Sequence, residues 1–383
     1  MKKQLCLMLA LLMLVGALGG CTEKLPDMTP TYSYTPRLKG LDSFCATTWD
    51  NYILTNHNAA IYDRTTGEVF FRLCQDVECD GNCPVEKGGV TFTGISKERL
   101  YFSVFAKDVY YGYYDILTGE ITYLLDISKD ERLPVQPMFV DGGYVYISRK
   151  HLKEGGDPKN AADYIAHLSR LPEDGGKEEV IYAMRGNAET LLLINDGVMY
   201  SYFESKLWKT DLETWELVVL HDLSTSEIDG VGEFSYLDGQ LYFNMIKNSD
   251  NKKYIIRMDA QTGEWSYLVD IPVTGYFITN EAVYFEPEAE RRLLSDPTRY
   301  PLGHEDAKTT NVSATLYACD LDGGNVRAVY TDELLAYQYC TIVDNVLYGW
   351  ICYFDQDRNA WGDIYFAELH FDTGEIIPAT VVD

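Results

Sequence analysis

One structural unit is repeated along this chain. Seven segments carry a turn rich in Asp, Asn or Gly that leads straight into an alternating, aromatic-rich strand: WDNYILTN (49–56), SKERLYFS (96–103), VDGGYVYI (140–147), NDGVMYSY (195–202), LDGQLYFN (237–244), TNEAVYFE (279–286) and VDNVLYGW (343–350). A second set of seven, most with a TGE- or DGG-like turn, alternates with the first: YDRTTGEVF (62–70), YDILTGEITYL (114–124), LPEDGGKEEVIY (171–182), TDLETWELVVL (210–220), MDAQTGEWSYL (258–268), CDLDGGNVRAVY (319–330) and HFDTGEIIP (370–378). Each turn joins the two strands of a hairpin, so every unit supplies four strands. The repeat predicts an all-β fold, a seven-bladed β-propeller of four-stranded antiparallel blades.

The repeats indicate a single domain. They run without a break over residues 41–383, although a chain of 383 residues often forms two domains. The abundant Tyr (30) and Phe (15) suit pleated, half-buried strands. The first and last blades must meet without leaving an exposed sheet edge. TYSYT (31–35) is a candidate for an extra strand on the last blade, whose final strand we expect near 376–382.

The N-terminus has the layout of an export signal. Residues 1–20 combine a basic start with an apolar run that is shorter than the roughly 20 residues needed to span a bilayer. LGGC (18–21) resembles the lipobox of bacterial lipoproteins, which implies cleavage before Cys21 and diacylation of its thiol. Residues 21–40 contain three prolines and few large aliphatic side chains, so we expect a flexible tether. The predicted location is the outer surface of the bacterial cytoplasmic membrane, or elsewhere in the envelope, with the domain held there by the lipid.

The charge balance limits the partners. The chain has 32 Lys and Arg against 59 Asp and Glu, a formal net charge of −27. A polyanion would be repelled over most of such a surface. We therefore expect no nucleic-acid partner, and membrane contact only through the lipid anchor.

The loops of a propeller fall on two faces according to strand order. Turns within hairpins lie on one face, and the connections between hairpins and between blades lie on the other, which we call the long-loop face. The length of the connecting loops varies mostly on this face, in 148–163, 287–314 and 353–362. Long irregular loops carry function more often than tight turns do. Glycan or protein ligands are expected on this face. Basic and aromatic residues that could hold an anionic or sugar-like ligand, unless they are simply solvated, are Arg149, Lys150, His151, Arg291, Arg292, Arg299, Tyr300 and Trp361.

Three cysteines lie close together after the first blade. Cys74, Cys79 and Cys83 are separated by four and three residues, and Cys45 is the nearest further thiol. An exported location favours a structural disulfide, while thiolates at short spacing also suit zinc. The spacing is not the x2 of a zinc knuckle, so the disulfide is the preferred interpretation.

One loop begins like a calcium site. Asp355, Asp357 and Asn359 place oxygen ligands at alternate positions, but Ala360 and Phe366 stand where an EF-hand needs Gly and Glu. A solvated loop is the default interpretation. No hydrolase or metalloprotease motif occurs in the sequence, so we predict no catalytic residue and no cofactor, and the sequence favours a protein without enzymatic activity.

The repeats resemble those of known propellers. LYACDLDGG (316–324) and DGQLYF (238–243) are similar to the YWTD-type repeats of low-density-lipoprotein-receptor relatives, and more closely to the DG-x-LYF and LYRxDLDG repeats of bacterial surface lipoproteins. The cysteine cluster resembles an LCxxxxCxH element of such lipoproteins, with Asp80 and Gly81 where its His would lie. The resemblance covers nearly the whole mature chain. It implies blade structure and transfers no functional residue.

These observations predict a lipid-anchored extracytoplasmic propeller that acts as a binding or scaffolding module. Two other classes stay open: a carbohydrate-active lyase or glycosidase with its site at the channel mouth, and a structural envelope-assembly protein.

Overall fold

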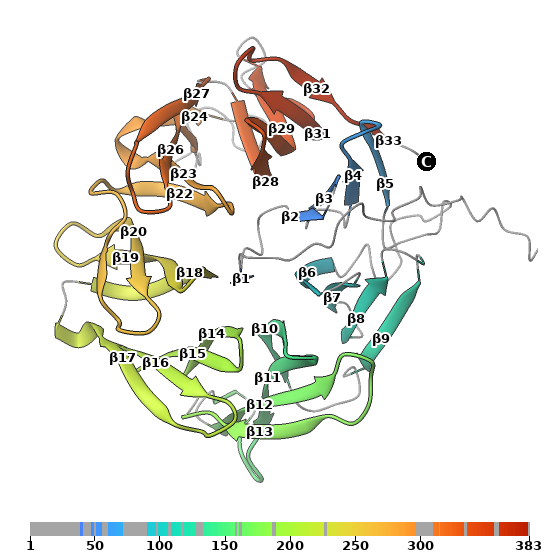
Figure 1. Ribbon diagram of the computed structural model, residues 1–383, viewed down its shortest axis with the longest axis vertical. Helices are drawn as coiled ribbons and strands as arrows, with labels where there is room; N and C mark the ends of the chain where they lie inside the picture. The colour runs from blue at the N-terminus through green and yellow to red at the C-terminus, as the bar shows by residue number, and fades with distance from the viewer. Residues whose placement is uncertain are drawn as a thin grey trace, which may run out of the picture.

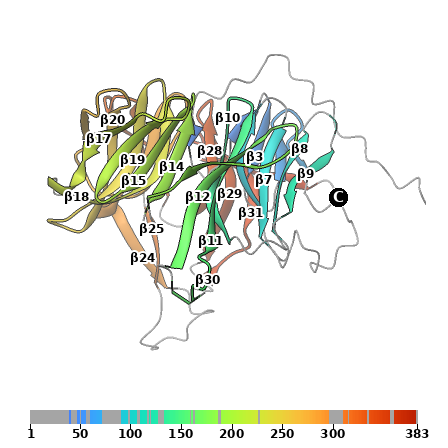
Figure 2. The ribbon, with the colours of Figure 1, turned by 90° about the horizontal axis from the view of Figure 1, so that it is seen from below.

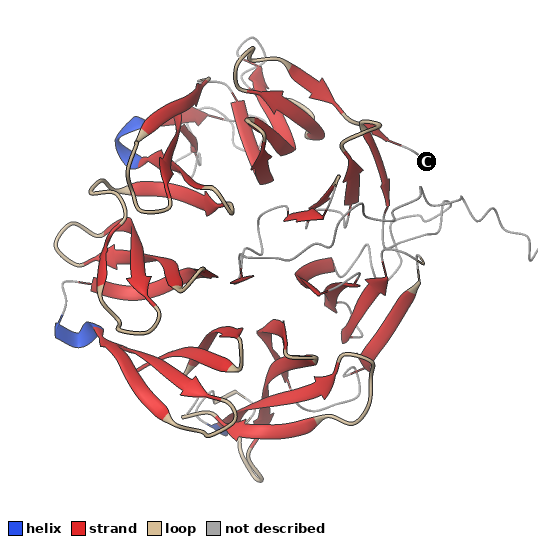
Figure 3. Cartoon of the chain, viewed as in Figure 1, coloured by secondary structure: helices blue, strands red, loops and turns tan. Residues whose placement is uncertain are grey.

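The computed structural model is built almost entirely of strands (Figure 3). It describes residues 39–40, 47–49, 51–55, 60–71, 90–96, 99–105, 109–115, 118, 120–126, 133–157, 159–160, 163–185, 189–225, 228–295, 309–313, 315–332, 335–355 and 360–381. Seven antiparallel sheets surround one axis, as Figure 1 shows. The predicted seven-bladed propeller is therefore confirmed.

The first four blades follow one another along the chain, each with its first strand nearest the axis (Figure 1). Blade 1 contains β2 (Thr47–Trp49), β3 (Tyr52–Thr55), β4 (Ala60–Asp63) and β5 (Glu68–Phe71). Blade 2 contains β6 (Val90–Ser96), β7 (Arg99–Phe105), β8 (Val109–Asp115) and β9 (Ile121–Asp126). Blade 3 contains β10 (Leu133–Asp141), β11 (Tyr144–Leu152), β12 (Tyr164–Pro172) and β13 (Glu179–Ala183). Blade 4 contains β14 (Thr190–Asn195), β15 (Val198–Phe203), β16 (Lys206–Asp211) and β17 (Leu217–Asp222), and a short 3-10 helix, η3 (Leu223–Thr225), leads on.

The last three blades repeat this order with additions. Blade 5 contains β18 (Ile228–Leu237), β19 (Gln240–Lys247), β20 (Lys252–Asp259) and β21 (Trp265–Tyr267). Blade 6 contains β22 (Val273–Ile278), β23 (Ala282–Pro287), β26 (Thr315–Asp320) and β27 (Arg327–Thr331). Between its two hairpins lie η4 (Glu288–Glu290) and a separate two-stranded ribbon, β24 (Arg291–Ser295) and β25 (Thr309–Ser313). Blade 7 contains β28 (Leu335–Val343), β29 (Val346–Asp355), β31 (Tyr365–His370) and β32 (Ile376–Pro378), with β30 (Ala360–Trp361) paired to β29.

Turn chemistry explains why the hairpins form where they do. Asp196 and Gly197, like Asp238 and Gly239, have positive φ at both positions, which is the backbone of the two-residue hairpin turn that suits twisted strands. In the second hairpins an Asp opens the turn and accepts backbone hydrogen bonds. Asp259 Oδ1, for example, accepts the N–H of Gln261 at 2.9 Å and of Thr262 at 2.7 Å.

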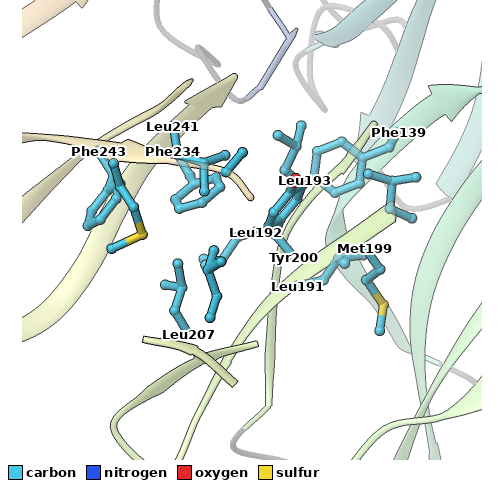
Figure 4. Close-up of a cluster of buried hydrophobic side chains, with 14 of the residues drawn as sticks. Phe139, Leu191, Leu192, Leu193, Met199, Tyr200, Leu207, Phe234, Leu241 and Phe243 are labelled. Atoms are coloured by element: carbon cyan, nitrogen blue, oxygen red, sulfur yellow. The ribbon is translucent and has the colours of Figure 1, made fainter. Parts of the chain in front are cut away.

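The core lies between neighbouring blades. Figure 4 shows its largest cluster, in which side chains from blades 3, 4 and 5 meet. Alternation explains this arrangement, because each strand sends successive side chains to the two faces of its blade and every blade is covered by a neighbour on both. Buried members of the cluster are Phe139, Leu191, Leu192, Leu193, Met199, Tyr200, Leu207, Phe234, Leu241 and Phe243.

The ring closes through the C-terminal strand β33 (Thr380–Val381). After β32 the chain leaves blade 7 and runs parallel to β5 of blade 1, with Thr380 opposite Glu68. Tyr62 Oη of blade 1 donates a hydrogen bond to Glu368 Oε1 of blade 7, and Arg64 pairs with Asp344 at 2.8 Å. The strand that joins the two end blades therefore comes from the C-terminus. TYSYT (31–35), the candidate for this role, lies outside the described residues.

A short N-terminal strand lies inside the ring. β1 (Lys39–Gly40) pairs antiparallel with β18, the innermost strand of blade 5, with Lys39 opposite Tyr236 and Gly40 opposite Ser235. Figure 1 places β1 beside the axis, across the ring from β2. The last two residues of the expected tether thus add a fifth strand to blade 5.

Candidate functional site

The long-loop face carries strands that extend beyond the disc. Seen from the side in Figure 2, β24, β25, β30 and the joined ends of β11 and β12 project from one side of the ring. The 287–314 connection is therefore not wholly irregular, because it contains the β24–β25 ribbon. The 148–163 segment begins in strand, since β11 continues to Leu152, and β12 starts directly after it at Tyr164. Three blades thus contribute ordered projections to the same face.

Arg149 does not belong to this surface. It lies within β11, and its side chain has an exposed fraction of 0%. Its Nη2 pairs with Glu178 Oε2 at 2.9 Å. A buried guanidinium needs such a partner because an isolated charge away from water is very costly. The expectation that Arg149 lies on an exposed loop is wrong, and the residue instead forms a buried ion pair within blade 3.

Lys150 and His151 follow Arg149 on β11 and are both half-buried. His151 Nδ1 lies 3.3 Å from Nδ1 of His167, a buried residue of the neighbouring strand β12. One ring donates its Nδ1–H and the other accepts it, so the two imidazoles are held against each other. Of the three basic residues predicted in this segment, Arg149 is fully buried, whereas Lys150 and His151 are each partly exposed.

The remaining predicted ligand-binding residues are only partly placed. Arg291 and Arg292 lie in β24, opposite Ser313 and Val312 of β25, and Trp361 lies in β30. Arg299 and Tyr300 are outside the described residues. The structure therefore puts Arg291, Arg292 and Trp361 on the projecting strands of the long-loop face.

The predicted metal and disulfide positions are mostly outside the described part of the chain. This applies to the lipidation site and to six further residues, namely Cys21, Cys45, Cys74, Cys79, Cys83, Asp357 and Asn359. Asp355 ends β29 and pairs in register with Ala360. Within the described ranges, no group of three or more His, Cys, Asp or Glu residues is arranged to hold a metal ion.

Three further cysteines lie within blades 6 and 7 and form no disulfide among the described residues. Cys319 and Cys340 are buried, and Cys352 is half-buried. Burial raises the pKa of the Cys319 thiol to about 12, so it stays protonated at neutral pH. A protonated, buried thiol is a poor nucleophile.

Sequence reasoning missed a set of polar contacts that joins blades 6 and 7. Glu286 of β23 accepts hydrogen bonds from Tyr337 Oη of β28 at 2.6 Å and from Thr274 Oγ1 of β22 at 3.3 Å. Burial, followed by the charge of Glu286, raises the pKa of Tyr337 well above its usual value. Because Tyr337 stays protonated, it remains a hydrogen-bond donor at any physiological pH.

A second set joins blades 5 and 6. Glu233 has a φ of 49° inside the bulged strand β18, and its carboxylate accepts a hydrogen bond from Asn244 Nδ2. Its backbone carbonyl accepts another from Tyr276 Oη of β22 at 2.8 Å. The glycines at 230 and 232, inside a strand, are the sequence signal that could have located the bulge. Glu233 and Glu286 already accept hydrogen bonds from other side chains of the protein, so these contacts connect neighbouring blades.

Comparisons with known proteins concern the fold. No family model matches the chain, and no curated protein matches it. An oligogalacturonate lyase from Vibrio parahaemolyticus is 8% identical with a TM-score of 0.46, over 89% of this chain and 93% of that one. Puromycin hydrolase is 12% identical with a TM-score of 0.47, over 90% of this chain and 54% of that one. A chain of the nidogen/laminin complex is 10% identical with a TM-score of 0.36, over 71% of this chain and 90% of that one. At such identities no activity transfers to this protein.

Among the described residues, no helix has the length and apolar character that crossing a bilayer requires.

Proposed function

We propose that this protein is a lipid-anchored, extracytoplasmic binding module that presents the long-loop face of its propeller to a ligand. The observation that carries the proposal is the gathering of ordered projections from blades 3, 6 and 7 on one side of the disc (Figure 2). The opposite face consists of hairpin turns such as Asp238–Gly239, whose backbone is already committed to the turn geometry. Binding residues concentrate where a rigid scaffold supports longer connections.

The anchor is supported by the sequence at the N-terminus. A basic start, an apolar run and LGGC (18–21) together match a lipoprotein signal. A single acyl chain gives only reversible membrane binding, whereas two chains anchor stably. Diacylation of Cys21 would therefore suffice to hold the domain at the membrane surface.

Replacing the anchoring cysteine tests this part of the proposal. We expect Cys21→Ala to move the protein from the membrane fraction to the soluble envelope fraction or the medium, because no acyl chain can then be attached. Cys319→Ala, which removes a buried thiol of blade 6, is the matched control and should stay with the membranes. Fractionation of both variants by centrifugation and immunoblotting provides the measurement. Retention of the Cys21→Ala variant in membranes would contradict the anchor.

The ligand class is proposed from the charge of the projecting strands. Lys150 on β11 and the pair Arg291 and Arg292 on β24 are basic residues on a chain whose net charge is −27. Arginine forms forked hydrogen bonds with carboxylates and phosphates, and an aromatic residue such as Trp361 offers a stacking face. An anionic or sugar-like ligand of the cell envelope fits these residues best.

Removing the β24–β25 ribbon tests the binding face. The ribbon is a separate two-stranded sheet, and β23 pairs directly with β26 without it. Replacing residues 289–313 by a short turn should therefore change the melting temperature little, since doubling a loop length costs only about 0.6 kcal/mol. Binding to the ligands identified on an array of envelope glycans should fall.

A variant of the opposite face serves as control. Gln240→Ala, next to the turn at Asp238–Gly239, should bind those glycans as the wild type does. Unchanged binding after ribbon deletion, together with loss in the control, would place the site on the tight-turn face and contradict the proposal.

A further inference from the structure

Blade 4 departs from the repeat at one position of its second hairpin. In blades 1, 5 and 7 the residue whose N–H closes the turn is a glycine with positive φ, namely Gly67, Gly263 and Gly374. In blade 4 this residue is Trp215, with φ of 61° and its N–H 2.9 Å from Asp211 O. A bulky side chain in the left-handed region is an outlier that costs conformational free energy. The turn would be less strained with glycine at position 215. The turn geometry therefore does not explain the tryptophan, and its role lies outside the turn.

Trp215 lies in the turn that joins β16 and β17, the two outer strands of blade 4. It stacks on Tyr182 of β13 in blade 3, with ring centroids 5.8 Å apart and planes within 3° of parallel. Its exposed fraction is 39%. The strained residue thus keeps a large aromatic surface in contact with solvent beside the junction of two blades.

The strand that follows continues this apolar surface. Leu217, Val218 and Val219 open β17 with exposed fractions of 40%, 47% and 40%. β17 is the outermost strand of blade 4, and among the described strands it pairs with β16 alone. Its later residues are covered by blade 5, where Trp265 Nε1 donates to His221 Nε2 at 2.9 Å. Only the first half of the edge is open.

This edge lacks the protection that proteins usually give to edge strands. Lysine, proline and other charged residues on an edge discourage the addition of a further strand. β13 begins with Glu179 and β27 with Arg327, and the edge of β5 is occupied by β33. β17 reads LVVLHD, with its carboxylate only at the covered end. The pairing of β33 with β5 also shows that an outer edge of this propeller accepts an added strand.

We propose that Tyr182, Trp215, Leu217, Val218 and Val219, together called the blade 4 patch, bind an extended segment of another protein. The segment would add as a strand to β17 through main-chain hydrogen bonds, with apolar side chains on the patch. The exposed carboxylates Glu213 and Glu216 flank Trp215. They favour a segment in which basic residues alternate with apolar ones. The patch lies on the outermost strands of blades 3 and 4 and on the β16–β17 turn, so it is distinct from the long-loop face.

A second copy of this chain is a less suitable occupant. Two molecules that each carry a net charge of −27 repel one another, and their patches would bring Glu213 and Glu216 together with the same residues of the partner. A basic partner is instead attracted by this charge. The occupant is therefore another protein with an extended, basic and apolar segment.

A synthetic peptide of alternating Val and Lys, labelled with a fluorophore, tests the proposal by anisotropy. We expect saturable binding to the wild type and protection of β17 amides from hydrogen exchange. Val218→Lys and Trp215→Gly should each weaken binding by about tenfold or more, because central apolar contacts dominate such interfaces. Trp215→Gly restores the residue used by blades 1, 5 and 7, so its melting temperature should be equal to or above that of the wild type.

Matched controls separate this site from general charge attraction. Val326→Lys makes the same change at an exposed valine of blade 6 and should leave binding unchanged. A Val and Glu peptide, or a Val and Lys peptide interrupted by proline, should not bind. Lack of saturable binding to the wild type, or equal binding to Val218→Lys, would overturn the proposal. A wild-type dimer in sedimentation that Val218→Lys dissociates would also overturn it, in favour of a second copy as the occupant.

Discussion

At the scale of single residues, glycine and arginine show what a sequence does and does not predict. The turn glycines were predictable because positive φ is a local requirement, and Gly239 indeed has a φ of 82°. The burial of Arg149 was not predictable, because a charged residue in SRKHLKEGG suggests a loop, whereas this residue lies within β11 and is fully buried. Burial of this kind depends on partners that are distant in sequence, such as Glu178.

Gly239 and Gly263 have similar φ values, but the space around the two residues differs, so their substitution by alanine should have different costs. A Cβ on Gly263 would lie 2.1 Å from the carbonyl oxygen of Leu220 in blade 4, whereas one on Gly239 would have nothing within 4 Å. Gly239→Ala should cost about 1–2 kcal/mol for the left-handed backbone alone. Gly263→Ala adds a clash with backbone and should cost about 2–5 kcal/mol in total. Urea denaturation of both variants provides the comparison, and equal costs would show that blades 4 and 5 do not approach this closely.

At the scale of elements, the hairpins were predictable and the additions were not. All fourteen turn segments in the sequence coincide with hairpins of the seven blades, because their Asp, Gly and Thr residues and the alternation beside them act locally. The β24–β25 ribbon escaped prediction, since thirteen residues separate RRLLS (291–295) from TTNVS (309–313) and no tight turn joins the two strands. The hydrogen bonds of Glu233 and Glu286 likewise connect different blades, so no local sequence pattern marks them.

The Asp that opens a second hairpin turn makes stability depend on pH. Hydrogen bonds from the Thr262 and Gln261 backbone lower the pKa of Asp259 below its ordinary value of 3.8. The unfolded chain therefore binds a proton before the folded one, so this contribution is present above pH 3.8 and is lost as the pH falls through the folded pKa. Asp259→Asn cannot take up that proton, and its unfolding free energy should fall less than that of the wild type between about pH 5 and about pH 3.

Urea denaturation at a series of pH values measures this slope. Asp363→Asn changes an exposed aspartate outside the hairpin turns, and its unfolding free energy should depend on pH as that of the wild type does. A wild-type slope in Asp259→Asn as well would mean that the turn hydrogen bonds do not stabilise the carboxylate.

At the scale of the whole molecule, the number of blades followed from the repeat, but the way the ring closes did not. A sequence pattern shows that the end blades must meet, and two segments, one at each end of the chain, could have joined them. In the structure, β33 pairs with β5 and so joins the two end blades. The hydrogen bond from Tyr62 to Glu368 and the ion pair of Arg64 with Asp344 add to this junction. The N-terminal strand β1 pairs with blade 5 instead. β33 and β1 are each two residues long, too short to show a periodic pattern.

A crystal structure of this protein tests the central claim of one closed seven-bladed ring most directly. We predict seven four-stranded antiparallel sheets around a single axis, with Thr380–Val381 parallel to Glu68–Phe71 and the projections of blades 3, 6 and 7 on the same face. Six or eight sheets, two separate β domains, or a C-terminal strand that remains on blade 7 would contradict the account.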